Sequence, residues 1–374
     1  MRILALMKYG PLAAGTRQRL MIYEPYLKAH GIEIEMKFLL DDDYVAALAR
    51  VERPDVLAVA ASYARRLWQV LKAGRYDLIW VYYETFPWLP GWFEGLVGLA
   101  GKPVVFDFDD AVFHRYDTSK SAAVRAVLGK KLVPLLARAD ACSCGNAYLK
   151  AYTERYCANS VVIPTVVDTA RYTPAGGTRD PDAPLVVGWI GSPSNWRHVS
   201  NLLPTLLPTL ASHGARLRVV GAGPRARGIA GVEAIEWTEA SEIAEVQGMD
   251  IGIMPLPDEP FARGKCGFKL VQYMACGLPV VASPVGVNRE IVEDGQNGFL
   301  AEGPEQWAER LGRLLTDADL RRRMGVRGRE RIIEHYSLAS QETRLLALIR
   351  SAVERRSAMG ARSALPPGDA VRLR

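Results

Sequence analysis

The stretch GKCGFKLVQYMACGLPVV, residues 264–281, decides the fold. An apolar helical pattern runs through its middle and passes, by way of Gly277 and Pro279, into a β-rich segment. Glycine after the last helical residue and proline soon after it are typical of a helix that returns to a sheet. Two lysines stand near the start of the helix, where cations oppose the helix dipole unless an anion binds. The stretch therefore predicts a helix-to-strand unit with an anion site beside it.

Strand and helix patterns alternate on both sides of this stretch. The expected strands are 2–7, 32–40, 77–83, 103–108, 139–143, 160–164, 185–190, 216–220, 232–236, 250–254, 279–282 and 298–301. Short runs rich in Val and Ile, separated by helical patterns, indicate βαβ units and parallel sheets. We therefore predict an α/β fold with two Rossmann-like domains whose parallel sheets face a cleft.

The chain has 374 residues, which is enough for two domains of ordinary size. Segment 168–184 carries proline, glycine and charge without periodicity, which indicates a linker. We expect a first domain at 1–167 and a second domain at 185–337. A helix at 338–356 is a candidate to pack back on the first domain, and a disordered tail is expected at 357–374.

Composition and charge exclude several classes of protein. Hydrophobic residues make up 49% and charged residues 24%, which is typical of a globular protein. The five cysteines show no repeated CxxC spacing, so we expect no bound metal and interpret them as thiols in a reducing cytoplasm. A net charge of +6 suits anionic partners, but the sequence shows no zinc finger, aromatic RNA-binding signature or basic heptad region, so nucleic acid is not expected.

Neither the N-terminal residues nor the longest apolar stretch predicts a membrane span. Residues 1–10 have a short apolar part and no cleavage site, so we expect a strand there rather than a signal peptide. Residues 86–101 contain two prolines and a glutamate and are too short to cross a bilayer. Trp88, Trp92 and Phe93 motivate the hypothesis that a cytoplasmic protein docks peripherally at the inner face of the membrane.

The loops after the strands are the places to look for ligand contacts, because ligands bind outside the carboxyl ends of parallel strands. The first loop, KYGPLAAGTRQR at 8–19, has small residues that let a ligand approach backbone N–H groups. A glycine turn for purely steric reasons is an equal alternative. The candidate loop or acceptor residues here are Gly15, Thr16, Arg17 and Arg19.

The segment FDFDDAVFHRYD at 106–117 brings carboxylates and a histidine to the end of a strand. Asp110 and His114 are candidates to orient or deprotonate a hydroxyl group. A metal cluster is the sharper alternative, but adjacent Asp109 and Asp110 in a strand would point to opposite faces. A second alternative is that these aspartates only cap the loop.

Two glycine-containing loops follow strands of the second domain. GWIGSPSNWRH at 188–198 occupies the expected phosphate position, with Gly191, Ser192 and Arg197 as candidates and packing of its tryptophans as the alternative. VVGAGPRARG at 219–228 fits the spacing of a dinucleotide fingerprint but lacks the following helix and the downstream acid. We interpret it as a ligand-facing loop and not as an NAD site.

In the opening stretch, Gly267 is expected just ahead of the helix. Lys265, Lys269 and Gln272, spaced four and three apart, should then share one face, where a diphosphate would offset the two positive charges. Ordinary surface lysines are the alternative. After the next strand, SPVGVNREIV gives a glycine turn at Gly286 and places Glu290 in a helix.

The segments GWIGS, VVGAGP, DIGIMPL, KLVQYMACGLPVVAS, GVNREIV and NGFL together resemble, in order, the nucleotide-sugar half of the GT-B-type retaining glycosyltransferases called family four. The resemblance runs from about Gly188 to Ser337, and the first domain matches only through its glycine loop and DFDDA. It implies a nucleoside-diphosphate sugar bound mainly by the second domain and an acceptor on the first. It also implies no metal and no tightly bound cofactor.

The resemblance further assigns the candidate donor residues. Arg197 and Lys265 or Lys269 would neutralise the diphosphate, and Gly191 would approach it. The residues expected beside the sugar and phosphates are Gly286, Val287 and Asn288, and Glu290 falls near the nucleotide.

One departure concerns two glutamates that family members commonly carry eight residues apart. This chain has Gly264 and Gln272 at those positions. Gln272 is still able to hydrogen-bond a ribose hydroxyl, but without charge. Asp258 and Glu259, slightly upstream, are candidate substitutes.

The expected activity is transfer of a sugar to an acceptor hydroxyl, with retention, in polysaccharide, glycan or glycolipid biosynthesis. Asp110, His114 and Lys265 are the expected catalytic residues, and the acceptor is a glycan, a lipid-linked sugar or a small molecule. Two alternatives are a nucleotide-sugar epimerase on the same fold and a catalytically silent sugar-nucleotide-binding protein. The second is motivated by Gly264 and Gln272.

Overall fold

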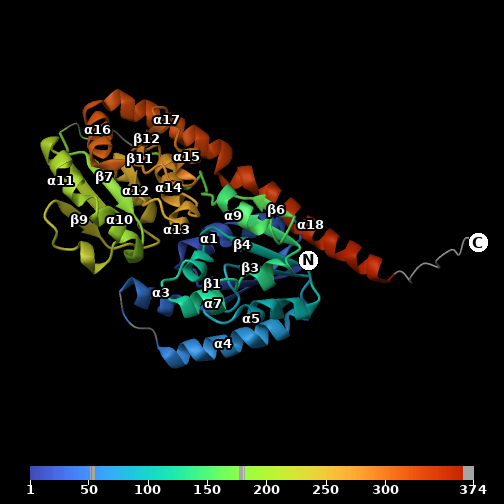
Figure 1. Cartoon of the computed structure of the whole chain (residues 1–374). Helices are drawn as coiled ribbons and strands as arrows, with labels where there is room; N and C mark the ends of the chain where they lie inside the picture. The colour runs from blue at the N-terminus through green and yellow to red at the C-terminus, as the bar shows by residue number, and fades with distance from the viewer. Residues whose placement is uncertain (51, 53–54, 177–179, 181, 365–374) are drawn as a thin grey trace, which may run out of the picture.

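Two six-stranded sheets, each parallel throughout, form the centre of the protein (Figure 1). The structure is a computed structural model that describes residues 1–50, 52, 55–176, 180 and 182–364. The strand orders are β2-β1-β3-β4-β5-β6 and β12-β11-β10-β7-β8-β9. The strands are β1 (Arg2–Tyr9), β2 (Glu33–Leu40), β3 (Leu78–Tyr82), β4 (Val104–Phe108), β5 (Ala141–Cys144), β6 (Ser160–Val162), β7 (Val186–Ile190), β8 (Arg216–Val220), β9 (Val232–Ile235), β10 (Ile251–Met254), β11 (Val280–Ala282) and β12 (Gly298–Leu300). Each forms at its predicted place, and the α/β fold with two parallel sheets is confirmed.

Helices connect the strands in each half. The first half contains α1 (Ala14–Arg19), α2 (Glu24–Ala29), α3 (Asp42–Ala49), α4 (Val56–Leu71), α5 (Gly91–Gly95), α6 (His114–Asp117), α7 (Ala122–Leu128), α8 (Val133–Leu136) and α9 (Ala147–Thr153). The second contains α10 (Trp196–Ser200), α11 (Leu203–Ser212), α12 (Glu242–Gln247), α13 (Pro260–Arg263), α14 (Phe268–Ala275), α15 (Asn288–Ile291), α16 (Gly303–Thr316), α17 (Ala318–His335) and α18 (Leu338–Ala364). Short 3-10 turns include η3 (Leu96–Ala100) and η5 (Pro224–Ala226). Within the described residues, no helix combines the length and apolar character needed to cross a membrane.

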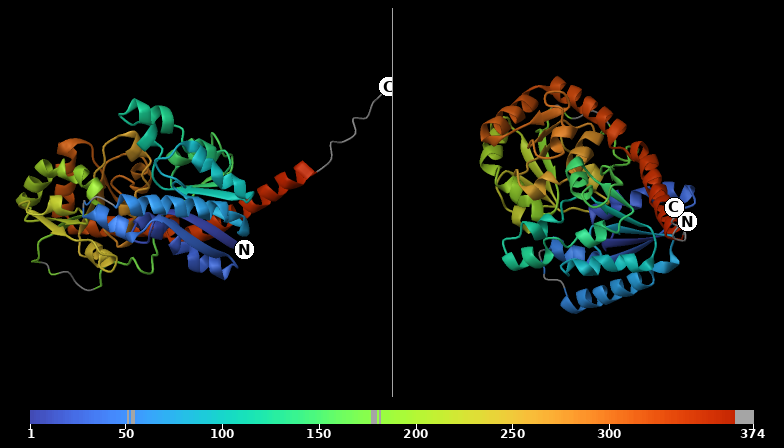
Figure 2. Two further views of the ribbon diagram at one scale, coloured as in Figure 1. Left: turned by 90° about the horizontal axis from the view of Figure 1, so that it is seen from below. Right: turned by 45° about the vertical axis from the view of Figure 1, so that its right-hand side comes forward.

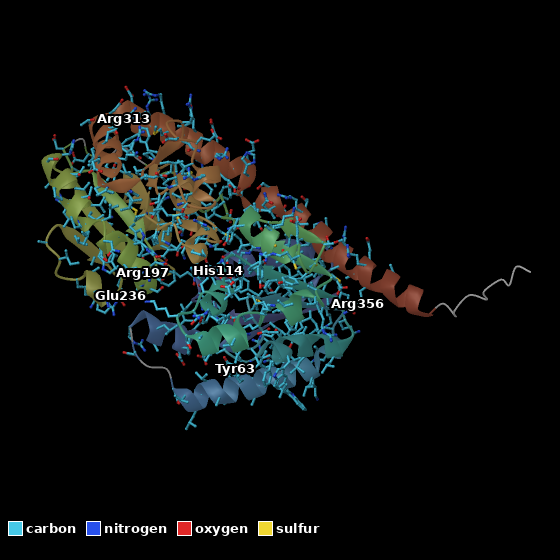
Figure 3. All side chains as sticks on the ribbon, viewed as in Figure 1. Tyr63, His114, Arg197, Glu236, Arg313 and Arg356 are labelled. Atoms are coloured by element: carbon cyan, nitrogen blue, oxygen red, sulfur yellow. The ribbon has the colours of Figure 1, made fainter. Side chains whose placement is uncertain are left out.

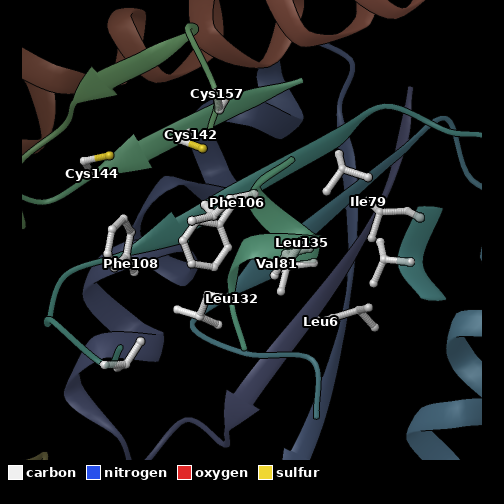
Figure 4. Packing of buried hydrophobic residues seen from close by; sticks show 14 of the residues in the cluster. Leu6, Ile79, Val81, Phe106, Phe108, Leu132, Leu135, Cys142, Cys144 and Cys157 are labelled. Carbon is white, nitrogen blue, oxygen red and sulfur yellow. The ribbon is translucent and has the colours of Figure 1, made fainter. Parts of the chain in front are cut away.

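Strand β1 shows why these sequences form buried parallel strands. Its residues Ile3 to Met7 are all buried, and alternate ones enter different cores. Leu4 and Leu6 pack with Val81, Phe106 and Phe108 on one face (Figure 4). Ile3 and its neighbours on the other face pack against α18. A strand buried on both faces needs a continuous apolar run, because successive side chains alternate between the faces.

Helix α18 lies along the first sheet, on the face opposite α4 (Figures 1 and 2). Leu345, Ile349 and Ala352 belong to the same core cluster as Ile3. The helix continues to Ala364, so 357–364 is helical where we expected disorder. The physical reason is that no proline interrupts the sequence before Pro366. The rest of the expected tail, 365–374, lies outside the described residues.

Residues 168–176, expected to form part of a linker, pack against the second half. Tyr172 is 4% exposed, and its carbonyl oxygen accepts a hydrogen bond of 2.7 Å from Arg329. Just before this segment, Val167 forms a parallel bridge with Ser337. The connection between the sheets is therefore tied down by tertiary contacts that its irregular sequence does not predict.

Arg19 is a structural residue of the first half. Its side chain is 2% exposed, forms an ion pair with Asp107 and donates to Ser143 Oγ at 2.8 Å and to the carbonyl of Ile163. These partners lie on β4, on β5 and just after β6. The prediction that Arg19 serves the acceptor loop is therefore wrong, because the second turn of α1 points it beneath the sheet edge rather than toward the cleft.

We predict that Arg19→Met lowers the free energy of unfolding by about 3 kcal/mol, because it leaves the buried Asp107 carboxylate without its partner. Urea or thermal unfolding measures this loss. The double variant Arg19→Met/Asp107→Leu should lose less than the sum of the single variants. Arg289→Met is the control, since Arg289 is exposed and 3.3 Å from Glu302, and should change stability by about 0.5 kcal/mol or less. Equal losses in Arg19→Met and the control would contradict the structural role.

Candidate active site

The carboxyl-terminal edges of the two sheets meet at residues 264–266. Asn146, the N-cap of α9, donates hydrogen bonds of 3.0 Å to the carbonyl oxygens of Gly264 and Lys265. A Cβ atom on Gly264 would lie 2.4 Å from the Cβ of Ala111. A side chain at position 264 is therefore excluded by the close approach of the first half. This accounts for glycine where the resemblance leads one to expect glutamate.

Lys265 projects from this junction toward the first half. Its Nζ lies 3.8 Å from Asp110 Oδ1, and the two side chains are 15% and 29% exposed. Lys265 precedes α14, because Gly267 adopts a left-handed conformation (φ 67°) and caps the helix. The prediction that Lys265 shares a helix face with Lys269 is thus wrong, but the structure does bring the lysine together with a predicted first-half residue.

Lys269 lies in the first turn of α14 beside the end of β7. A Cβ on Gly191 would come within 2.7 Å of Lys269 Cε, so the glycine makes room for the lysine stem. The ammonium group lies 5.6 Å from the centre of the Trp189 ring. Burial, together with the neighbouring Lys265, lowers the pKa of Lys269 to about 8, while Asp110 acts in the opposite direction. Two cations thus share a partly buried site.

Arg197 stands apart from the lysines. Its side chain is 69% exposed, lies 3.9 Å from Glu259 and lines a cavity of about 340 Å³ together with His198 and Trp307. Figure 3 places Arg197 on the second half and His114 near the junction. Ser192 is also exposed and bonds within its own loop, to Ser194 and Asn195. Both residues are therefore exposed and have partners other than the lysines.

His198, which sequence reasoning missed, is electrostatically close to the lysine pair. Burial is the main cause that lowers its pKa to about 4, followed by the positive charges of Arg197, Lys265 and Lys269. The imidazole is therefore neutral near pH 7. A lone histidine in a helical segment gave no sequence signal of this proximity.

A second cavity, of about 280 Å³, opens between the two halves. The predicted donor residues that line it are Gly286, Val287 and Glu290, and the first half contributes Asn146 and Tyr148. His114 is not among the lining residues. Its Nε2 lies 2.8 Å from the Tyr148 hydroxyl, and its Nδ1 lies 2.8 Å from Asp117. His114 therefore reaches this cavity only through Tyr148.

Two predicted donor residues shape the loops around this cavity. A Cβ on Gly286 would lie 2.5 Å from the carbonyl oxygen of Arg263, so the chains pass too closely for a side chain. Asn288 is 1% exposed and donates to the carbonyl of Ser283 at 3.0 Å. The Asn288 amide therefore holds the turn after β11, and its place beside the sugar and phosphates stays a prediction.

Comparisons with known proteins agree with this architecture. Residues 184–317 match the family model described as glycosyl transferases group 1. The chain is 28% identical over 349 residues to a D-inositol 3-phosphate glycosyltransferase of Salinispora tropica, covering 78% of this chain and 67% of that relative. These matches support a glycosyltransferase of the group 1 type. The expected family and enzyme class are thereby confirmed.

Solved structures show the same two-domain GT-B fold as this glycosyltransferase. A sucrose-phosphate synthase of Thermosynechococcus elongatus aligns with a TM-score of 0.68 at 18% identity, covering 96% of this chain and 100% of that one. HepE of Anabaena, in complex with UDP-glucose, aligns with a TM-score of 0.67 at 16% identity, covering 94% and 100%. At these identities the likeness establishes the fold.

The glycine loop of the glycosyltransferase is shaped by packing. A Cβ on Gly15 would lie 2.0 Å from the Tyr82 hydroxyl, and Thr16 Oγ1 donates to the carbonyl of Tyr9 at 2.9 Å. Arg17 reaches across to the second half, where its Nη2 lies 3.5 Å from Glu242 Oε2. The small residues of the loop thus accommodate a tyrosine, and only Arg17 extends toward the cleft.

Gln272 also differs from its predicted placement. It is 3% exposed, and its Nε2 donates to the Tyr172 hydroxyl at 3.2 Å and to Glu242 Oε1 at 3.0 Å. Gln272 is therefore buried and paired with Glu242 instead of lying open beside the lysines. The polar partners come from α12 and from the connection between the sheets, neither of which carried a motif.

Asp109 and Asp110 of the glycosyltransferase have separate partners. Asp109 Oδ1 accepts hydrogen bonds from the hydroxyls of Tyr82, at 2.7 Å, and Tyr83. Tyr83 has φ 68°, which is strained for a residue other than glycine. Asp110 instead faces Lys265. In the part of the chain that the structure describes, no three His, Cys, Asp or Glu side chains form a group suited to a metal ion.

Proposed function

We propose that this glycosyltransferase moves a sugar from a nucleoside-diphosphate sugar to an acceptor hydroxyl, with retention, in glycan, polysaccharide or glycolipid biosynthesis. The observation that carries the proposal is the lysine pair, in which Lys269 lies beside Gly191 at the end of β7 and Lys265 lies opposite Asp110 of the first half. The family resemblance supports retention. The structure of HepE in complex with UDP-glucose supports a nucleotide-sugar donor.

The lysine pair suits a diphosphate leaving group. Two like charges in a partly buried site repel each other, which is why Lys265 contributes to the lowered pKa of Lys269. A diphosphate would replace this repulsion by attraction to both ammonium groups. Its negative charge increases as the bond to the sugar breaks, so preorganised cations stabilise the transition state more than the ground state. No reorganisation of solvent is needed when the charge develops.

Donor sugar and phosphates would extend from the lysines toward Gly286, Val287 and Glu290. These residues line the cavity between the halves, and Tyr148 lines it from the opposite side. Both halves thus contribute to one cavity, which would hold the two substrates close together. Such positioning converts a bimolecular reaction into an effectively unimolecular one.

Asp110 is the proposed residue that receives the acceptor hydroxyl. Its carboxyl group lies on the first half, directly across from Lys265. Burial raises the pKa of Asp110, and the positive charge of Lys265 opposes that effect. A carboxylate of raised pKa is a better hydrogen-bond acceptor for a hydroxyl whose oxygen attacks the sugar. His114 would act on the acceptor through the Tyr148 hydroxyl.

Helix α4 supports the further proposal that the acceptor is presented at a lipid surface. Leu57, Trp68 and Leu71 are 80%, 60% and 60% exposed, although large apolar side chains are usually buried. From Val56 to Arg75 the sequence has no acidic residue and several basic ones. Figures 1 and 2 show α4 on the outer side of the first half. An amphipathic helix with exposed Trp and Leu and only positive charge suits a surface of anionic lipid.

Trp88 and Trp92 extend the exposed apolar surface of the first half. They are 57% and 62% exposed, whereas Phe93, the third residue of the docking hypothesis, packs against the core. Helix α4 was not part of that hypothesis, because an apolar helix in an α/β sequence is ordinarily interpreted as a core element. Its exposure is visible only once the helix has been placed on the outside of η3.

The function is tested by incubating the protein with UDP- and GDP-sugars and a panel of glycan, lipid-linked and small-molecule acceptors. Transfer to an acceptor is the expected result, and Lys265→Ala should lower kcat/KM by about a hundredfold. Arg313→Ala, on the far side of the second half, is the matched control (Figure 3). Epimerised donor without acceptor would favour the epimerase, and nucleotide binding without turnover would favour the silent binding protein.

The affinity for UDP should fall as the pH rises through about 8. Lys269 is charged below its lowered pKa of about 8 and neutral above it, so the cation that attracts the diphosphate is lost in that interval. Isothermal titration at pH 7 and pH 9 should show affinity weakening by about tenfold. Lys269→Arg keeps its charge throughout and should remove the dependence. An unchanged dependence in that variant would contradict the role of Lys269.

Membrane docking is tested by flotation with vesicles of phosphatidylcholine alone or with anionic phosphatidylglycerol. The wild type should float with the anionic vesicles, and Trp68→Ser/Leu71→Ser should remain in the soluble fraction because the exposed apolar surface is reduced. Val326→Ser, another exposed apolar position but on α17, is the control and should still float. Flotation of the α4 variant at the wild-type level would rule out docking through this helix.

A further inference from the structure

Glu242, at the start of α12, gathers hydrogen-bond donors from four separate segments. Its carboxylate is 6% exposed and accepts from Gln272 Nε2 at 3.0 Å, Trp237 Nε1 at 2.7 Å and the hydroxyl of Tyr172. The fourth donor is Arg17 Nη2, at 3.5 Å, from the first half. A buried carboxylate that is satisfied in this way is stable only while its partners stay in place. Glu242 therefore links α14, the connection between the sheets and the first half.

Arg17 uses its whole guanidinium group at this contact. Nη1 donates to the carbonyls of Pro11 and Leu12, at 2.8 and 3.0 Å, and so holds the loop from which it comes. Nε lies 3.8 Å from Glu239, and the group stacks over the Trp237 ring at 5.1 Å. The side chain is only 10% exposed. Arg17 thus ties the loop at 10–17 to the second half.

The contact adjoins the lysine site. Gln272 lies one turn after Lys269 on α14, so the two side chains are neighbours on the helix. A Cβ on Gly221 would lie 2.5 Å from the carbonyl oxygen of Gly191 and 3.1 Å from Trp237 Cβ. Gly221 is therefore packed between Trp237, whose ring Arg17 covers, and Gly191, which accommodates Lys269. Docking of Arg17 places the first-half loop beside the proposed diphosphate site.

The identity of Gln272 follows from its partner. Its amide donates to Glu242 Oε1 and to the Tyr172 hydroxyl oxygen. A glutamate at position 272 would bring a second carboxylate to within hydrogen-bond distance of Glu242 in a buried site. One of the two would have to take up a proton or move away. The pair therefore requires one carboxylate and one amide.

We propose that Glu242 and Gln272 form a carboxylate–amide pair that positions Arg17 and its loop over the donor site, so that closure of the two halves is coupled to transfer. The proposal rests on the proposed function. Glu242 is a positioning residue, because it acts through Arg17 and α14 and not on the reacting atoms. The contact with Arg17 is broken whenever the halves separate, whereas those with Gln272 and Trp237 remain within the second half.

Four variants of the full-length protein test the proposal: Gln272→Glu, Glu242→Gln, the exchange Glu242→Gln/Gln272→Glu, and Arg17→Gln. Three quantities are measured for each, namely hydrogen exchange of the amides at 10–17, Tm, and the kinetic parameters of transfer. Glu236→Gln is the control, because Glu236 lies in the same half but is 82% exposed, with Arg227 at 3.5 Å (Figure 3).

Gln272→Glu and Glu242→Gln should both increase exchange at 10–17 and lower kcat by about tenfold, which corresponds to losing one charge-assisted hydrogen bond. The affinity for UDP should change by less than about threefold, because the lysines are untouched. Arg17→Gln should show the same increase in hydrogen exchange and the same fall in kcat as Gln272→Glu. Its loss of Tm should be smaller. The double variant Glu242→Gln/Gln272→Glu should recover most of the Tm and part of the kcat, since it keeps one carboxylate and one amide.

Unchanged hydrogen exchange at 10–17 in both Gln272→Glu and Glu242→Gln would overturn the proposal. A double variant Glu242→Gln/Gln272→Glu that is no more stable than Gln272→Glu would also overturn it. A fall in Tm with kcat unchanged would show a merely structural pair and also overturn it. If the wild type transfers no sugar, the proposed function fails separately. Hydrogen exchange and Tm then still decide whether the pair positions the loop.

Discussion

The close contact between residues 264–266 and the first half is the constraint on which the active site depends. Asn146 holds the carbonyls of Gly264 and Lys265, and Ala111 leaves no room for a side chain at position 264. This contact fixes where Lys265 emerges and therefore which first-half residue it meets. Asp110 is the carboxylate at that point. A side chain at 264 would push the two halves apart and separate the cation from the carboxylate.

The electrostatics of the second half follow from this geometry. Lys265 and Lys269 lie near each other, and among the described residues Asp110 is the carboxylate that faces them, so the site carries more positive than negative charge. Proteins seldom keep unpaired cations in partly buried sites without a ligand that compensates them. The charge imbalance therefore suits the anionic donor that we propose. The neutral state of His198 is another result of the same imbalance.

Several substitutions relative to the family pattern have a common steric or electrostatic origin. Glycine at 264 is required by the close approach of Ala111. Glutamine at 272 donates a hydrogen bond to the carboxylate of Glu242. Neither change by itself indicates a silent protein, because each is explained by a neighbour. The carboxylate beside Gln272 on α14 belongs to Glu242 of α12. Asp258, considered as a substitute from the sequence, pairs with Arg263 and lines the cavity between the halves.

The sequence by itself determined the strands, the parallel direction of the strands in each sheet and the position of the lysine segment. Hydrophobic periodicity and glycine or proline boundaries are local properties of the chain. It also identified Lys265 and Lys269 from their place near the start of a helix, and Asp110 from its place after a strand. Only the tertiary structure decided that Arg19 is buried, that Arg17 crosses to Glu242 and that α4 is exposed. These outcomes depend on which distant residues meet: Arg17 and Glu242 are brought together by the packing of two sheets, and no spacing along the chain encodes that distance.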